Sequence, residues 1–172
     1  MRFFDEKFKE NKTHYILQAC LAGVAVAIAL AFFDVVRQPV IIASFGASAF
    51  IAFTVPKRPN SSPRKLIGGY MIGAIVGCLI NILVILPAEN YFTTAEYHLA
   101  LESIHIMAGA AAVALSMFLM TITETEHPPA ASIALGFVVN EWTLATVVFV
   151  LAGISAISLV KRIFKSWMID LL

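Results

Sequence analysis

A His-Pro-Pro run in the second half of the chain carries the residue types best suited to binding a small anion. Pro128 and Pro129 predict a helix start directly after His127, because proline fits the first turn of a helix and not its interior. A helix start presents free backbone N–H groups and the positive end of the helix dipole, which attract anions. Ser132 adds a hydroxyl donor, and His127 can donate a hydrogen bond or carry a positive charge.

A second segment that begins with proline lies in the first half. Pro39 opens this segment, and Gln38 precedes it as His127 precedes the other. The segment then carries hydroxyl, small and aromatic candidates for a binding site: Ser44, Phe45, Gly46 and Ser48. Two helix starts that face each other from opposite leaflets would form a compact site for a small planar anion. The alternative is plain helix packing, with prolines that only form turns and His127 at the membrane surface.

Charged residues flank both breaks in the apolar pattern. Asp34 and Arg37 lie at the first break, and Glu124 and Glu126 lie at the second. Glu126 beside His127 could raise the pKa of the imidazole and form a proton relay or gate. Arg37 would attract an anion at an entrance or pair with Asp34. The alternative for the acids is that they are solvated at the ends of membrane helices.

Small residues recur at every fourth position in one apolar stretch. Gly69, Gly73 and Gly77 form this stripe, which is typical of close packing between membrane helices. We therefore expect the stripe to serve helix packing and not chemistry.

Neither a metal site nor an enzyme is expected. His98, Glu102 and His105 share one helix face with a spacing that can bind a metal, but they lie near an aromatic belt at a membrane surface. The sequence contains no phosphate-binding loop, nucleophile elbow, His-Glu-x-x-His or Cys-x-x-Cys motif. We expect no cofactor.

The composition indicates an integral membrane protein. Of the 172 residues, 60% are hydrophobic and 13% are charged, about half the charged share of a soluble domain. The mean hydropathy is +0.87. A net charge of +1 implies no nucleic-acid partner, and no Lys or Arg lies between Leu66 and Val160. These features predict one transmembrane domain in a lipid bilayer.

The apolar pattern predicts an all-α membrane protein. Four stretches are long enough to cross a bilayer, which takes roughly 20 helical residues: 16–33, 66–86, 104–123 and 143–160. Two shorter segments, 39–55 and 128–139, each begin with proline. We therefore expect four long transmembrane helices plus two short membrane helices.

The positions of the basic residues predict the topology. Lys and Arg gather in the N-terminal tail, in the loop 56–65 and in the C-terminal tail, whereas the loop 88–103 is acidic. By the positive-inside rule the three basic regions are cytoplasmic, and only six crossings satisfy that pattern. Three crossings in each half make 3+3 inverted repeats. The expected divisions are an interfacial tail (1–13), repeat one (14–87), an outer loop (88–103), repeat two (104–160) and an interfacial tail (161–172).

Three stretches together resemble the HPP family of integral membrane proteins. They are ASFGASAF at 43–50, SPRKLIGGYMIGAIVG at 62–77 and TETEHPPAAS at 123–132. Family members are usually described with four transmembrane helices, and plant chloroplast and cyanobacterial members as nitrite transporters. The family commonly has Gly-Gly-His where this chain has Gly68-Gly69-Tyr70. A proton or substrate role of that histidine in relatives would be missing here.

The resemblance and the helix-start argument together predict transport of a small inorganic anion, nitrite first. Chloride, nitrate or formate would satisfy the residue argument equally, so nitrite depends on the resemblance. One alternative is a proton- or cation-handling protein that uses Glu124, Glu126 and His127. Another is a membrane scaffold that packs a partner on the glycine stripe. We expect a homo-oligomer in a bacterial inner membrane with both termini in the cytoplasm.

Overall fold

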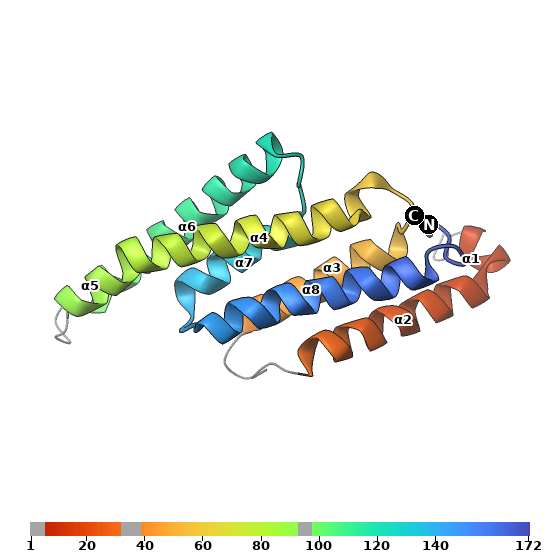
Figure 1. Ribbon diagram of the computed structural model, residues 1–172, viewed down its shortest axis with the longest axis horizontal. Coiled ribbons are helices and arrows are strands. Elements are labelled where there is room, and N and C mark those ends of the chain that lie inside the picture. The colour runs from red at the N-terminus through yellow and green to blue at the C-terminus, as the bar shows by residue number, and fades with distance from the viewer. Residues whose placement is uncertain (1–5, 32–38, 93–97) are drawn as a thin grey trace.

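The computed structural model describes residues 6–31, 39–92 and 98–172, and all regular structure among them is helical (Figure 1). The predictions for Asp34, Arg37 and Gln38 concern residues outside the described part of the chain. The elements are α1 (Glu6–Glu10), α2 (Lys12–Leu30), α3 (Pro39–Thr54), the 3₁₀ turn η1 (Pro59–Ser61), α4 (Pro63–Ile80), the π-helical turn η2 (Asn81–Ile85), α5 (Leu86–Tyr91), α6 (His98–Ile122), α7 (Pro128–Val139) and α8 (Leu144–Phe164).

The predicted four long and two short membrane helices are confirmed. The spans Lys12–Leu30, Pro63–Tyr91, Leu99–Ile122 and Leu144–Phe164 are long and apolar enough to cross a membrane. The second span is longer than the predicted 66–86 because α4, η2 and α5 form one continuous helix. Pro87 does not end this helix. It directly follows the π-helical turn η2, where the N–H of Leu86 bonds to the Asn81 carbonyl five residues earlier, so the regular i→i−4 pattern is already interrupted before Pro87.

Local sequence signals begin the helices that position the core. The Ser62 hydroxyl accepts a hydrogen bond from the backbone N–H of Lys65 and caps α4, with Pro63 in its first turn. Thr143 and Thr146 form a reciprocal capping box at the start of α8. These caps satisfy backbone donors that would otherwise be unpaired at helix ends.

The six long and short helices run alternately in opposite directions along the molecule (Figure 1). One end of the bundle, here the basic end, holds the start of α2, η1, residues 123–127 and the C-terminal residues. The Tyr15 hydroxyl donates to the Leu171 carbonyl at 2.8 Å there, and Arg64 Nη2 donates to the Thr123 carbonyl at 3.0 Å. This arrangement agrees with six crossings, and the side of the membrane that this end faces stays a prediction.

Contacts between helices follow the predicted inverted repeat. Helices α2, α3 and α4 correspond in order to α6, α7 and α8. The α2–α3 contact has its counterpart in α6–α7, α2–α8 in α4–α6, and α3–α8 in α4–α7. The pairs α3–α7 and α4–α8 each join two equivalent helices, one from each repeat. Because equivalent helices run in opposite directions, the second repeat is inverted relative to the first (Figure 1).

The glycine stripe of α4 packs inside the chain against α7. A Cβ added at Gly77 would lie 2.6 Å from the Ala134 carbonyl oxygen, and one added at Gly69 would lie 2.8 Å from His127 Cβ. Gly73 similarly faces the Ala130 carbonyl. The predicted packing role fits this contact. The scaffold alternative loses its docking surface, because α7 already covers the stripe.

The C-terminal residues pack onto the basic end of the bundle. After α8 and a short turn the chain is not helical, and Met168 is buried. The backbone N–H of Ile169 donates to Gln18 Oε1 at 3.1 Å, and that of Leu171 donates to the Thr54 carbonyl at 2.8 Å. The tail therefore holds the ends of α2 and α3 together.

Candidate functional site

The second short helix begins inside the bundle. Helices α3 and α7 lie side by side and antiparallel, with Ser44 Oγ donating to Ser132 Oγ at 3.0 Å and Ser48 Oγ 2.8 Å from His127 Nε2. Ser48 is six residues before Thr54, the last residue of α3. At 1.5 Å per residue, His127 and the start of α7 therefore lie roughly 9 Å below that end of α3.

A buried polar cluster joins three helices at this point. Ser48 Oγ on α3 is 2.8 Å from the Tyr70 hydroxyl on α4 and 2.8 Å from His127 Nε2 at the start of α7. His127 is only 1% exposed, and its Nδ1 atom has no hydrogen-bond partner among the described residues. The Phe45 ring packs on Tyr70 with ring centroids 5.6 Å apart, which closes one side of the cluster.

The cluster holds more donor protons than hydrogen bonds. The Tyr70 hydroxyl, the Ser48 hydroxyl and the neutral imidazole of His127 each carry one proton. Two hydrogen bonds join these three groups, so one proton is left without an acceptor. When both bonds run toward the imidazole, the remaining donor is His127 Nδ1–H, and when both run away from it, the remaining donor is the Tyr70 hydroxyl. When both groups donate to Ser48 Oγ, the remaining donor is the Ser48 hydroxyl. In each arrangement an unused buried donor favours an additional acceptor.

The start of α7 offers fewer backbone donors than the proline argument predicted. Pro128 and Pro129 carry no N–H, and the N–H of Ala130 donates to the His127 carbonyl at 2.8 Å. The expectation of several free backbone N–H groups is therefore wrong for these first three residues. The helix dipole remains, but the hydrogen-bond donors at this site come from side chains.

Ser44 and Ser132 form a second polar contact one turn further along both short helices. Ser44 Oγ also lies 3.0 Å from the Val40 carbonyl, and Ser132 Oγ donates to the Pro129 carbonyl at 2.8 Å. These hydroxyls are thus satisfied locally by their own helices. They line the α3–α7 contact and hold no unused buried donor of the kind found around Ser48.

Two ion pairs join residues 123–127 to the start of α4 at the basic end. Lys65 Nζ lies 2.7 Å from Glu126 Oε2, and Arg64 Nη1 lies 3.8 Å from Glu124 Oε2. The hydrogen bond from Lys65 holds the pKa of Glu126 below its ordinary value. Both carboxylates therefore pair with α4 at the surface, and the ion pair of Glu126 is with Lys65 and not with His127. Such a geometry gives no support to the predicted proton relay.

The structure separates some predicted site residues from the cluster. Gly46 faces outward from α3, and a Cβ added there would meet nothing within 4 Å. Pro39 lies at the other end of α3 from Ser48. The sequence reasoning singled out Tyr70 only as a departure from a family pattern and assigned it no role. The position of Tyr70 directly after Gly69, on the helix face predicted to pack against a neighbour, could have indicated that its hydroxyl is buried.

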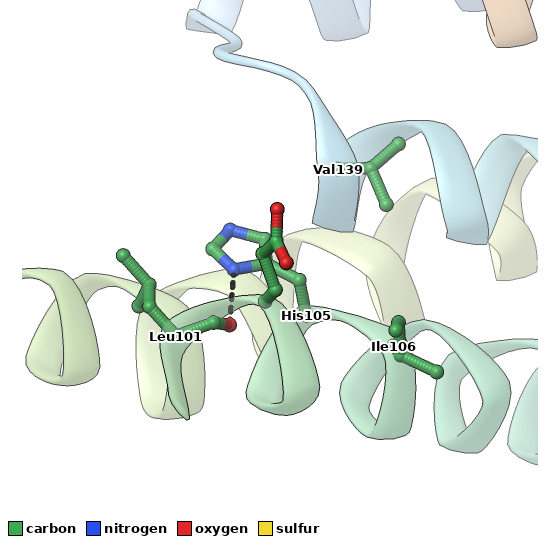
Figure 2. Close-up of a pocket in the computed structure, with 5 residues that line it drawn as sticks. Leu101, His105, Ile106 and Val139 are labelled. Carbon is green, nitrogen blue, oxygen red and sulfur yellow. Dashed lines mark hydrogen bonds between the residues drawn. The ribbon is translucent and has the colours of Figure 1, made fainter. Parts of the chain in front are cut away.

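His105 lines a hollow at the far end, the end of the bundle opposite the basic end. Figure 2 shows its ring with Nδ1 3.0 Å from the Leu101 carbonyl, between Leu101 and Ile106 of α6 and across from Val139 of α7. His105 Nε2 also lies 3.4 Å from Glu89 Oε1. The side chain of His98 lies outside the described part of the chain. Among the described residues no group of three His, Cys, Asp or Glu side chains could hold a metal ion.

These features define a class of protein: an integral membrane protein with six apolar helices in two inverted repeats and a buried polar cluster where the two short helices meet. The model of the HPP transmembrane region matches residues 8–168. The chain therefore belongs to the HPP family.

Two relatives in Dictyostelium discoideum are named only as transmembrane proteins. One is 38% identical over 99 residues, which cover 58% of this chain and 30% of the relative. The other is 33% identical over 95 residues, which cover 55% of this chain and 26% of the relative. The matched part thus spans less than a third of each relative's length. No solved structure matches the chain.

Proposed function

We propose that this HPP-family protein transports a small inorganic anion across the membrane, with nitrite as the first candidate. The observation that carries the proposal is the buried cluster of Ser48, Tyr70 and His127, which has three donor protons and two hydrogen bonds. An anion supplies the acceptor that this cluster lacks. Buried polar groups within a membrane domain are costly, so they favour a functional explanation.

The chemistry of the donors suits passage more than tight binding. Hydroxyls and a neutral imidazole stabilise an anion through hydrogen bonds without a full opposite charge. A transported ion must bind well enough to enter a site and weakly enough to leave it. The positive end of the α7 helix dipole, which lies next to His127, also attracts an anion.

In the structure the cluster is closed. Ser48 and Tyr70 are fully buried, His127 is 1% exposed, and Ser48 contacts His127 directly. An anion that takes the unused donor must therefore displace groups that now bury the cluster. We interpret the structure as an occluded state of a transporter.

Flux into proteoliposomes tests the proposal. Purified protein would be reconstituted, and uptake of nitrite, nitrate, chloride and formate would be followed beside empty liposomes. We expect His127→Ala and Ser48→Ala to reduce flux of the transported anion at least tenfold. Ser155→Ala is the matched control, because Ser155 lies exposed on α8 and its hydroxyl donates only to the Leu151 carbonyl at 2.6 Å.

The result can contradict the proposal in two ways. A folded protein that moves none of these anions above the empty-liposome rate would exclude it. Equal flux in Ser48→Ala, His127→Ala and Ser155→Ala would remove the cluster from the pathway. Proton flux without anion flux, measured at two pH values in the same vesicles, would favour the proton-handling alternative.

A further inference from the structure

Asn81 is a buried polar side chain that the anion proposal does not use. It begins η2, the π-helical turn between α4 and α5, and is 8% exposed. Its carboxamide makes no hydrogen bond among the described residues. An amide in a membrane helix normally finds a protein partner, whereas Asn81 lines a pocket instead. π-helical turns are rare and are frequent at functional sites.

Asn81 lines a pocket of about 500 Å³ at the far end, here the Asn81 pocket. The pocket lies where η2 and α5 meet α6 and the end of α7. Its other polar lining residues are Glu89, His105, Asn140, Glu141 and Trp142. His105 and Val139 line both this pocket and the neighbouring hollow in Figure 2, so the two openings are adjacent.

The lining of the Asn81 pocket is suited to a cation. Glu89 and Glu141 contribute carboxylates, and among the described residues no Lys or Arg lines the pocket. One partner of Glu89 is His105, at 3.4 Å, and Asn140 Nδ2 donates to the Gly136 carbonyl at 2.9 Å. The carboxamide of Asn81, for which no hydrogen bond to a described residue is found, is then a polar group available to a ligand in the pocket.

The same lining favours an organic cation over a metal ion. The described residues provide no group of three His, Cys, Asp or Glu side chains for a metal. An ammonium group needs only a few oxygen acceptors. Trp142 contributes an indole, a group that can make cation–π contacts, and Ile82, Leu86 and Val138 provide apolar walls for an alkyl body.

We propose that the Asn81 pocket binds the ammonium group of a primary amine. Asn81 Oδ1 and the carboxylate of Glu89 would accept its N–H hydrogens, and the alkyl body would lie on Ile82 and Val138. This site lies at the opposite end of the bundle from the His127 cluster and does not depend on the anion proposal. The amine can be a free molecule or the headgroup of an aminated lipid, since both carry the same group.

Trp142 provides a direct reporter of binding. The chain has two tryptophans, and Trp167 lies at the basic end beside His14. The full chain with Trp167→Phe would be placed in phosphatidylcholine nanodiscs and titrated with propylammonium chloride, with sodium chloride at equal ionic strength as the reference. We expect a saturable change in Trp142 fluorescence with propylammonium and none with sodium.

Substitutions then test the residues. We expect Asn81→Leu to weaken propylammonium binding at least tenfold, and Glu89→Gln to weaken it several-fold. Asn90→Leu is the matched control, because Asn90 is exposed on α5 and its side chain donates to the Leu86 carbonyl at 2.9 Å. This control is expected to leave the affinity unchanged.

Three outcomes would overturn the proposal: no saturable change, an equal response to sodium, or equal affinities for Asn81→Leu and Asn90→Leu. Nanodiscs that contain phosphatidylethanolamine distinguish the two sources of the amine. A weaker apparent affinity for propylammonium there indicates that the lipid headgroup occupies the pocket, and an unchanged affinity indicates a free amine. Anion flux in Asn81→Leu vesicles is expected to stay within twofold of wild type, which keeps this test separate from the anion proposal.

Discussion

The two short helices occupy equivalent places in the two repeats but contact their neighbours differently. Helix α7 meets α4 backbone to backbone: a Cβ added at Gly77 would lie 2.6 Å from the Ala134 carbonyl oxygen. Helix α3 meets α8 through the tip of a side chain, since a Cβ added at Gly153 would lie 2.8 Å from Phe45 Cζ. On its outer face, a Cβ added at Gly46 would meet nothing within 4 Å.

This difference divides the polar cluster between a fixed part and a part that can shift. Backbone contacts cannot be relieved by a change of rotamer, whereas contacts made by side-chain tips can. Tyr70 and His127 belong to the tightly joined pair α4 and α7, and Ser48 belongs to α3. We therefore expect the cluster to open by movement of α3 relative to the α4–α7 pair.

The largest effect is expected at the backbone contact. Gly77→Val would force α4 and α7 apart and destabilise the folded protein by about 3 kcal/mol, near the upper end for overpacking. Gly46→Val is the matched control on α3, and we expect its stability to change by less than about 1 kcal/mol, the range of helix propensities. Thermal unfolding in detergent measures both. Equal tolerance of valine at the two glycines would remove the distinction between the two helices.

Two serines on α3 provide the next comparison. Ser48→Ala leaves both the Tyr70 hydroxyl and His127 Nε2 without their shared partner and should cost roughly 2 kcal/mol of stability. Ser44→Ala should cost less than about 1 kcal/mol, because Ser132 keeps its bond to the Pro129 carbonyl. Unfolding measurements on both variants test this order. The reverse order would contradict the view that Ser48 joins the cluster.

A reversible cross-link between the short helices tests the expected movement of α3. Ser44 and Ser132 are in direct contact, so Ser44→Cys with Ser132→Cys brings two thiols together across the α3–α7 interface. In a background with Cys20 and Cys78 replaced, oxidation is expected to reduce anion flux about tenfold, and reduction is expected to restore it. Each single-cysteine variant serves as a control. Full flux through the oxidised pair would show that α3 need not move relative to α7.

The smallest effect concerns the Lys65–Glu126 ion pair at the basic end. Because Lys65 holds the pKa of Glu126 below its ordinary value, the ion pair stabilises the folded protein above the ordinary pKa of glutamate. This contribution is lost as the pH falls through the lowered pKa. Glu126→Gln should therefore lower the Tm slightly at pH 7 and match wild type at strongly acidic pH. A difference that grows on acidification would contradict the assignment.

Much of the fold could be predicted from local patterns. Long apolar stretches correspond to α2, α4–α5, α6 and α8, and Pro39 and Pro128 mark the starts of α3 and α7 as expected. The extension of the α4–α5 span to Tyr91 could not be predicted, because proline normally interrupts a helix and the π-helical turn that precedes Pro87 was not recognised from the sequence. His127 and Ser48 were both named as site residues. Their contact, between residues 79 positions apart in the sequence, depends on the antiparallel register of α3 and α7.

The sequence by itself determined the membrane class, the proline-marked starts of α3 and α7 and the alternation of directions, because hydropathy, proline geometry and basic residues act locally or along the chain. Only the tertiary structure decided which side chains meet. It brought Tyr70 to Ser48, paired Glu126 with Lys65 and placed Asn81 in the lining of a pocket, with no hydrogen bond to a described residue. Those outcomes depend on how each helix is rotated and how closely neighbouring helices pack. Between α4 and α7, the glycines of α4 set the packing distance, because they allow the two backbones to approach closely.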